Sequence, residues 1–141
     1  MEQNQHCGFL IKQIHDALEK QANNDLRKQD LTMAQVAVLL ALDDLPNKQA
    51  TLKVLESILR VAQSTTVGII ARLEQKGLVE GFGDPSDKRI KMVKMTASGE
   101  TCCAGAKDSM DMTEQALLSA LTEDERITFY QLLQKVSQYM K

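Results

Sequence analysis

The hydrophobic period of the chain changes within residues 63–96, whose sequence is QSTTVGIIARLEQKGLVEGFGDPSDKRIKMVKMT. The first part has an inner face at helical spacing, formed by Thr66, Ile70 and Leu73. Gly77 follows at the position where many helices end in a left-handed residue. These features predict a helix over residues 63–76.

The second part of this stretch has the pattern of a β-hairpin. Residues 78–82 and 90–95 are short runs with several apolar residues, and they flank residues 83–89, GDPSDKR, which favour turns. The sequence therefore predicts two short strands joined by a loop over residues 83–89.

A short helix is expected directly before residue 63. Residues 52–59 have an apolar face, formed by Leu52, Leu55, Ile58 and Leu59. Only three residues separate the two helices, so the pair predicts a helix-turn-helix, whose second helix usually enters the major groove of DNA. The outward face of that second helix carries small residues, hydroxyls and one cation: Ser64, Thr65, Gly68, Ala71 and Arg72. Such residues permit close approach to base edges and supply hydrogen-bond donors.

Longer helices are predicted on both sides of this unit. Residues 5–28 form an amphipathic helix, and Thr32 with Gln35 forms a capping box that opens a deeply buried second helix. Thr96 and Thr122 open a fifth and a sixth helix. Their expected inward residues are Cys103, Ala106, Met110, Thr113 and Leu117 in the fifth helix, and Phe129, Leu132, Leu133, Val136 and Met140 in the sixth. We expect a single domain that is mainly α with a small β-hairpin.

Composition and charge narrow the class of protein. The 141 residues carry a formal net charge of −2, but residues 48–94 alone carry +4, and the thirds before and after carry −3 each. A basic centre between acidic ends is consistent with a local anion-binding surface. No apolar run is long enough to cross a bilayer, no signal sequence is evident, and three cysteines cannot all pair within one chain. We therefore expect a cytoplasmic protein that binds no membrane.

Residues 51–99 resemble the winged helix-turn-helix of the multiple antibiotic resistance regulator (MarR) family. Residues 71–80, ARLEQKGLVE, resemble the end of that family's recognition helix and its first wing strand. The D-x-x-D-x-R pattern of residues 84–89, with residues 93–96 and Gly99, resembles its wing and the start of its next helix.

The resemblance implies a division of the chain and a function. Residues 31–99 form the DNA-binding lobe, and residues 1–30 and 100–141 form helices that interlock in a homodimer. The implied function is transcriptional regulation by binding a pseudo-palindromic operator in double-stranded DNA. The resemblance also implies that the protein represses transcription and that a small aromatic or phenolic effector, commonly an anion, relieves this repression.

The resemblance also assigns candidate site residues. The positions that face the groove are Gln63, Ser64, Thr65 and Val67. Arg72 is expected near the DNA backbone, Lys88 at a phosphate and Arg89 at the minor groove, whereas Asp84 and Asp87 stabilise the wing. Gly68 and Gly81 stand where many members of the family carry arginine. The absence of these two arginines leaves an alternative function open, in which the winged helix binds another protein and does not bind DNA.

The cysteines and histidines offer other hypotheses. A thiol redox sensor would use Cys7, Cys102 or Cys103, although buried or inert thiols are the simpler interpretation. A zinc site would combine His6, Cys7 and His15 with a cysteine of the fifth helix, but no close-spaced Cys/His pattern supports it. The sequence also lacks a phosphate-binding glycine loop and a nucleophile motif, so we expect neither an enzyme nor a cofactor.

Overall fold

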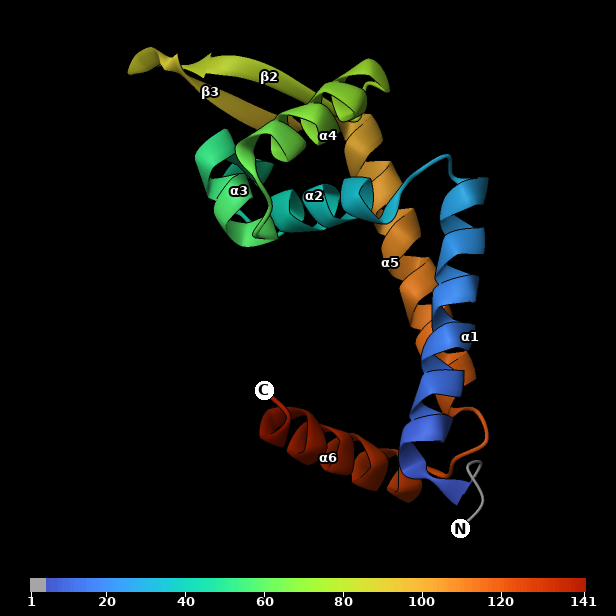
Figure 1. Cartoon of the computed structure of the whole chain (residues 1–141). Coiled ribbons are helices and arrows are strands. Elements are labelled where there is room, and N and C mark those ends of the chain that lie inside the picture. Colours follow the sequence, from blue (N-terminus) through green and yellow to red (C-terminus); the bar gives the residue numbers. More distant parts are fainter. Residues whose placement is uncertain (1–4) are drawn as a thin grey trace.

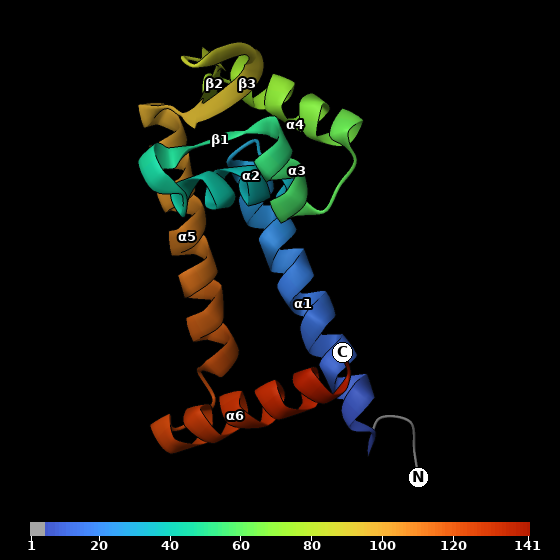
Figure 2. The same cartoon turned by 90° about the vertical axis from the view of Figure 1, so that its left-hand side faces the viewer.

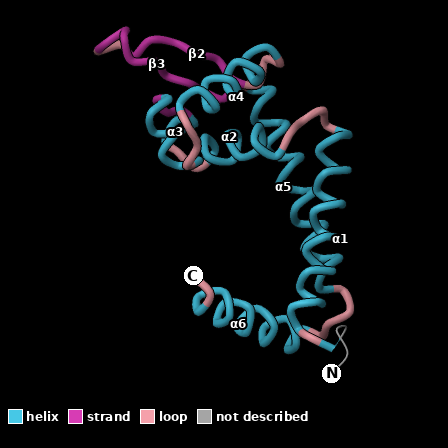
Figure 3. Tube along the Cα trace, viewed as in Figure 1, coloured by secondary structure: helices cyan, strands magenta, loops and turns pink. Residues whose placement is uncertain are grey.

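The computed structural model describes residues 5–141 and is mainly helical. Its elements in chain order are α1 (Cys7–Lys28), α2 (Met33–Asp43), the 3-10 turn η2 (Pro46–Lys48), β1 (Gln49–Thr51), α3 (Leu52–Leu59), α4 (Gln63–Gln75), β2 (Val79–Asp84), β3 (Asp87–Met95), α5 (Ala97–Leu118) and α6 (Glu123–Tyr139). The helices α2, α3 and α4 gather with the sheet in one lobe, while α1 and α5 extend away from it (Figure 1). Helix α6 crosses the far end of this pair, and the loops between elements are short (Figures 2 and 3).

Threonine side chains begin four of the helices, three of which, those opened by Thr32, Thr96 and Thr122, were predicted from the sequence. Thr32 and Gln35 form a reciprocal capping box, in which the Gln35 amide donates to Oγ1 of Thr32 at 3.2 Å. Thr122 forms the same box with Glu125, and the Oγ1 atoms of Thr51 and Thr96 also accept amide hydrogen bonds. These bonds satisfy amides that have no partner inside the helix, so they define where each helix begins.

The sheet is larger than the sequence predicted. Its three antiparallel strands lie in the order β1-β3-β2. Strand β1 was not expected, because three residues are too short to show an alternating pattern. The expected loop over residues 83–89 is wrong in extent: Gly83 pairs with Lys91 and Asp84 with Asp87, so only Pro85 and Ser86 separate the strands. Because neither face of the hairpin end is buried, its residues do not alternate between apolar and polar. The strand residues 83, 84 and 87–89 were therefore assigned to the loop.

Helix α2 lies at the centre of the hydrophobic core. Val38, Leu39 and Leu42 of α2 are fully buried, and residues of α3, α4, β3 and α5 surround them. The predicted inner face of α4 is confirmed, since Thr66, Ile70 and Leu73 are all buried. The apolar side of α4 therefore faces the core, and its opposite side faces outward.

The expected inward face of α6 is wrong for a single chain. Leu132, Leu133, Val136 and Met140 are all exposed, because α6 stands away from the lobe and the described residues do not cover it. Ile58 in α3 and Met110 in α5 are also about half exposed. The spacing of apolar residues shows which face of a helix is apolar, but it does not show whether the same chain buries that face.

Within residues 5–141, no single helix has both the length and the apolar composition to span a membrane. Only the combined length and composition of α3 and α4 would be sufficient, and the chain bends by 111° at the break between these two helices.

A pair of glycines provides a test of this packing. A Cβ at Gly99 would lie 2.1 Å from the backbone oxygen of Leu78, whereas one at Gly68 would meet nothing within 4 Å. We expect Gly99→Ala to lower the unfolding free energy by about 1–3 kcal/mol through overpacking. Gly68→Ala, the matched control at an exposed position of α4, should raise the unfolding free energy by about 0.5–1 kcal/mol. Chemical denaturation measures both, and equal effects of the two variants would contradict the described junction of α5 with the sheet.

Candidate nucleic-acid interface

Helices α3 and α4 have the geometry of a helix-turn-helix. Their 111° bend lies within the usual range for this motif. Arg60 closes α3 in a left-handed conformation with φ of 55°, and its amide donates to the backbone oxygen of Glu56 at 2.8 Å. Thr66 then fixes the first turn of α4 by donating from Oγ1 to the backbone oxygen of Ala62 at 3.2 Å. The turn therefore holds α4 with a defined face outward.

The outward face of α4 holds the candidate residues of the recognition helix. Gln63, Ser64, Thr65 and Val67 are all exposed, and Gly68 leaves the middle of this face open. Arg72 is exposed toward the C-terminal end of α4, where it lines a hollow with Arg27 and Lys76. Helix α4 and the hairpin lie together at the end of the molecule opposite α6 (Figure 2). The candidates on α4 thus share one end of the molecule with the hairpin.

The tip of the hairpin is held by its two aspartates. Asp84 accepts hydrogen bonds from the amide and the hydroxyl of Ser86 at 2.9 and 2.8 Å. Asp87 accepts from Nε and Nη2 of Arg89, both at 3.1 Å, and from the Arg89 amide. The side-chain bond from Arg89 holds the pKa of Asp87 below its ordinary value, and the Ser86 amide does the same for the pKa of Asp84. Lys88 and Arg89 are exposed beside these aspartates, so both cations are presented to solvent at the tip.

A lysine tether at the end of α4 was missed by sequence reasoning. Nζ of Lys76 donates to the backbone oxygen of Asp30 and, at 3.0 Å, to Oε1 of Gln35. Asp30 itself has a left-handed backbone, with φ of 56°, in the turn between α1 and α2. The tether therefore connects the end of the candidate recognition helix to the end of α1. More than 40 residues separate the partners, and no local pattern marks the pair.

A second missed contact lies beside the glycine at position 81. Nζ of Lys91 donates to Oε1 of Glu74 at 3.2 Å, which joins β3 to α4. A Cβ at Gly81 would lie 2.7 Å from Cε of Lys91, so the glycine makes room for this side chain. The space that a longer residue would occupy is thus taken by Lys91, which places another cation beside α4.

The structure does not bring the candidate redox cysteines together within one chain. Cys7 is exposed at the start of α1, at the end of the molecule far from the start of α5 (Figure 1). Cys102 is half-buried, and Cys103 is buried with its Sγ 3.8 Å from the backbone oxygen of Leu39. Burial raises the pKa of the Cys103 thiol, which disfavours the reactive thiolate.

The proposed zinc ligands are not assembled either. Burial against α2 keeps Cys103 away from the first turn of α1, where Cys7 lies. Instead, His15 lies near Asp16 and Glu19 in an exposed group on α1, with ligand atoms within 4.8 Å of one another. Exposed groups of this kind are common on helices, and this one differs from the expected site.

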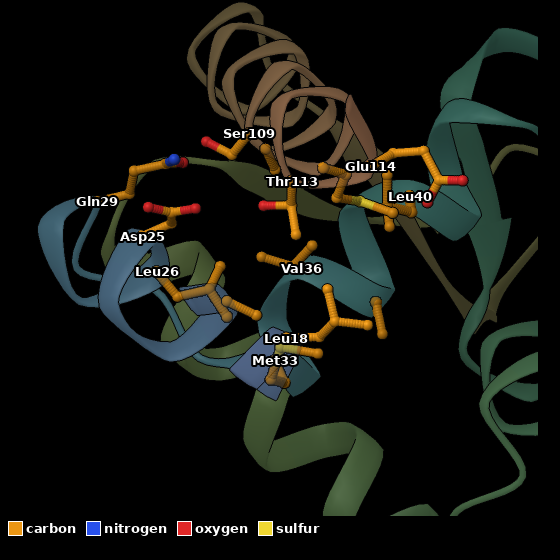
Figure 4. Close-up of a pocket in the computed structure, with 14 residues that line it drawn as sticks. Leu18, Asp25, Leu26, Gln29, Met33, Val36, Leu40, Ser109, Thr113 and Glu114 are labelled. Carbon is orange, nitrogen blue, oxygen red and sulfur yellow. The ribbon is translucent and has the colours of Figure 1, made fainter. Parts of the chain in front are cut away.

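A cavity of about 380 Å³ lies where α1, α2 and α5 meet (Figure 4). Its walls include Leu18 and Leu26 of α1, Val36 and Leu40 of α2, and Thr113 of α5. The cavity adjoins the end of α1 and is therefore close to the turn that carries Asp30.

Comparison with known proteins points to one family. The model described as MarR family matches residues 29–90. The transcriptional regulator HosA of Escherichia coli O111:H- is 34% identical over 107 residues, which cover 76% of this chain and 78% of HosA. A mutant of E. coli MarR, solved in complex with operator DNA, superposes with a TM-score of 0.70 at 32% identity and covers 92% of this chain and 91% of its own. Bordetella bronchiseptica BpsR, solved to explain regulation of its DNA binding by 6-hydroxynicotinic acid, has a TM-score of 0.71 at 25% identity, with 97% and 96% covered.

The wing aspartate provides a pH-dependent test. Because the pKa of Asp87 is lowered in the folded protein, its pairing with Arg89 stabilises the hairpin tip above pH 3.8 and is lost as the pH falls through the folded-state pKa. We expect the carboxyl carbon of Asp87, followed by NMR, to titrate at a higher pH in Arg89→Ala than in the wild type. Lys88→Ala removes a neighbouring cation without removing these bonds, and it should leave the midpoint unchanged. An unchanged midpoint in Arg89→Ala would contradict the described pairing.

Proposed function

The chain belongs to the MarR family of winged-helix transcriptional regulators, and from this premise we propose that it is a repressor that acts as a homodimer. It binds a pseudo-palindromic site in double-stranded DNA, and a small molecule releases it.

The observation that carries this proposal is the shared exposure of the outer face of α4 and of the hairpin tip. Gln63, Ser64 and Thr65 have donors and acceptors suited to base edges, and Val67 can contact a thymine methyl group. Arg72 and Lys88 are assigned to phosphates. Arg89 is assigned to the minor groove, where its remaining donors are free of Asp87. The solved complex of E. coli MarR with operator DNA supports this assignment by similarity.

The exposed apolar faces support the homodimer. Leu10 and Ile14 of α1 and Leu133 and Val136 of α6 are at least 39% exposed, although their spacing is that of a buried face. Large exposed apolar faces on soluble proteins mark interaction sites. A second copy would cover them by two-fold symmetry, and each copy would then present α4 to one half-site about 34–36 Å from the other.

The cavity supports release by a small molecule. Leu26 and Gln29, at the end of α1, line the cavity just before Asp30, which holds Lys76 at the end of α4. A ligand that favours a different position of this end of α1 therefore favours a different position of α4. BpsR, whose DNA binding is regulated by 6-hydroxynicotinic acid, supports this mode by similarity.

Arg89 provides the test of DNA binding. We expect Arg89→Ala to bind DNA from immediately upstream of its own gene more weakly than the wild type, because one contact between a cation and a phosphate-lined groove is lost. Plotted as the logarithm of affinity against the logarithm of salt concentration, the slope should fall by about one. Fluorescence anisotropy across a salt series measures both quantities.

Two other variants separate this effect from general damage. Lys20→Ala removes an exposed cation from α1 and should leave affinity and slope unchanged. Thr65→Ala should change the preference between related sequences more than it changes the slope. Equal binding by Arg89→Ala and the wild type at physiological salt would place the hairpin tip away from DNA and contradict the proposal.

A further inference from the structure

We propose that the cavity between α1, α2 and α5 binds an amphipathic cation, such as an aromatic amine, in preference to an anion. This inference rests on the proposed release by a small molecule and names the chemical class of that molecule. It departs from the anionic aromatic effector that the family resemblance led us to expect.

The walls of the cavity suit an apolar ring. Leu18, Leu26, Val36 and Leu40 supply branched apolar side chains, and Met33 and Met110 add polarisable sulfur atoms. The volume of about 380 Å³ lies within the range of ligand pockets in proteins. An aromatic or other apolar group of modest size is therefore a suitable occupant of this part of the cavity.

The charges that line the cavity in the described part of the chain are exclusively negative. Asp25 and Glu114 contribute carboxylates, and none of the described lining residues is Lys, Arg or His. Among residues 5–141, neither carboxylate forms a salt bridge, and the one hydrogen bond to Asp25 comes from Nε2 of Gln21 at 3.0 Å. The described lining of an adjoining cavity, which shares Leu18 and Asp25, also lacks a cation. An anion would find no counter-charge here and would be repelled, whereas a cation would be attracted.

The polar groups are placed to receive the donors of an ammonium group. The Asp25 carboxylate lies at one end of the cavity together with Gln29, Ser109 and Thr113, while Glu114 lies beside Leu40 at the other end (Figure 4). An ammonium group has three donors and no acceptor, and Asp25 and the three residues around it all offer oxygen acceptors. Asp25 is thus the expected partner of the charge, with the ring against the leucines.

A matched set of probes tests the charge preference. The full-length protein is titrated by calorimetry at pH 7 with 1-naphthylmethylammonium, 1-naphthalenemethanol and 1-naphthoate, which share a ring system and differ in charge. We expect the ammonium compound to bind most tightly and the carboxylate most weakly. Tighter binding of the carboxylate, or binding of none of the three, overturns the inference.

Amide variants of the two carboxylates test which of them binds the ammonium group. Asp25→Asn keeps the shape of the side chain and should weaken binding of the ammonium compound about tenfold or more, because a charge-assisted hydrogen bond is lost. The alcohol should bind this variant as it binds the wild type, which also shows that the variant is folded. Glu114→Gln should weaken binding of the ammonium compound as well, whereas Asp111→Asn, an equal charge change on α5 outside the cavity lining, should not. Unchanged ammonium binding in both Asp25→Asn and Glu114→Gln overturns the inference.

The charge preference of the cavity and the proposed DNA binding are tested by separate measurements. Calorimetry uses no DNA, so the charge preference is measured whether or not the protein binds an operator. If the ammonium compound binds with the expected preference but leaves a DNA complex intact, the ligand class stands and release by that ligand is contradicted.

Discussion

The burial of one side of α4 against α2 is the constraint on which the rest of the structure depends. Thr66, Ile70 and Leu73 are inserted into a core whose centre is Val38, Leu39 and Leu42. Because this side of α4 is fixed, the opposite side is presented outward, with hydroxyls and small residues that can approach another molecule closely. The hairpin is fixed by the same core through Val93 and Met95 of β3, so the two cations at its tip, Lys88 and Arg89, keep a defined position relative to α4.

The same core also brings the cavity and α4 within reach of each other. Val36 lines the cavity from the helix that supports α4, and Leu26 lines it from the last full turn of α1. Lys76 then connects the turn after α1 to the end of α4 through Asp30 and Gln35. Contacts therefore run from the cavity to the end of α4 through one turn and one lysine side chain.

The parts of the fold that were predictable from the sequence are those set by local chemistry. The caps formed by Thr32, Thr96 and Thr122 and the inner face of α4 depend on residues within two turns of one another, and the structure confirms them. The Lys76 tether and the contact of Lys91 with Glu74 join residues distant in the chain, and no local pattern marks them. The apolar face of α6 was correctly recognised as apolar, but the spacing of its residues does not identify what buries it, and the described residues of one chain leave it exposed. The roles of Gln63, Ser64, Thr65 and Arg89 at DNA stay predictions, because they require a duplex as well as a fold.

The distance between the two α4 helices of a dimer on DNA is the sharpest test of whether the outward face of α4 enters the major groove. The native cysteines are first replaced by Cys7→Ser, Cys102→Ser and Cys103→Ala, so that a spin label attaches at one position only. Ala71→Cys, on the exposed side of α4, then carries the label. Pulsed dipolar spectroscopy is recorded with and without operator DNA. If the two α4 helices lie in successive major grooves on one side of the duplex, the distance distribution on DNA is narrow and centred at about 34–36 Å. The absence of any dipolar coupling between copies, or a broad distribution that DNA does not narrow, would contradict this placement.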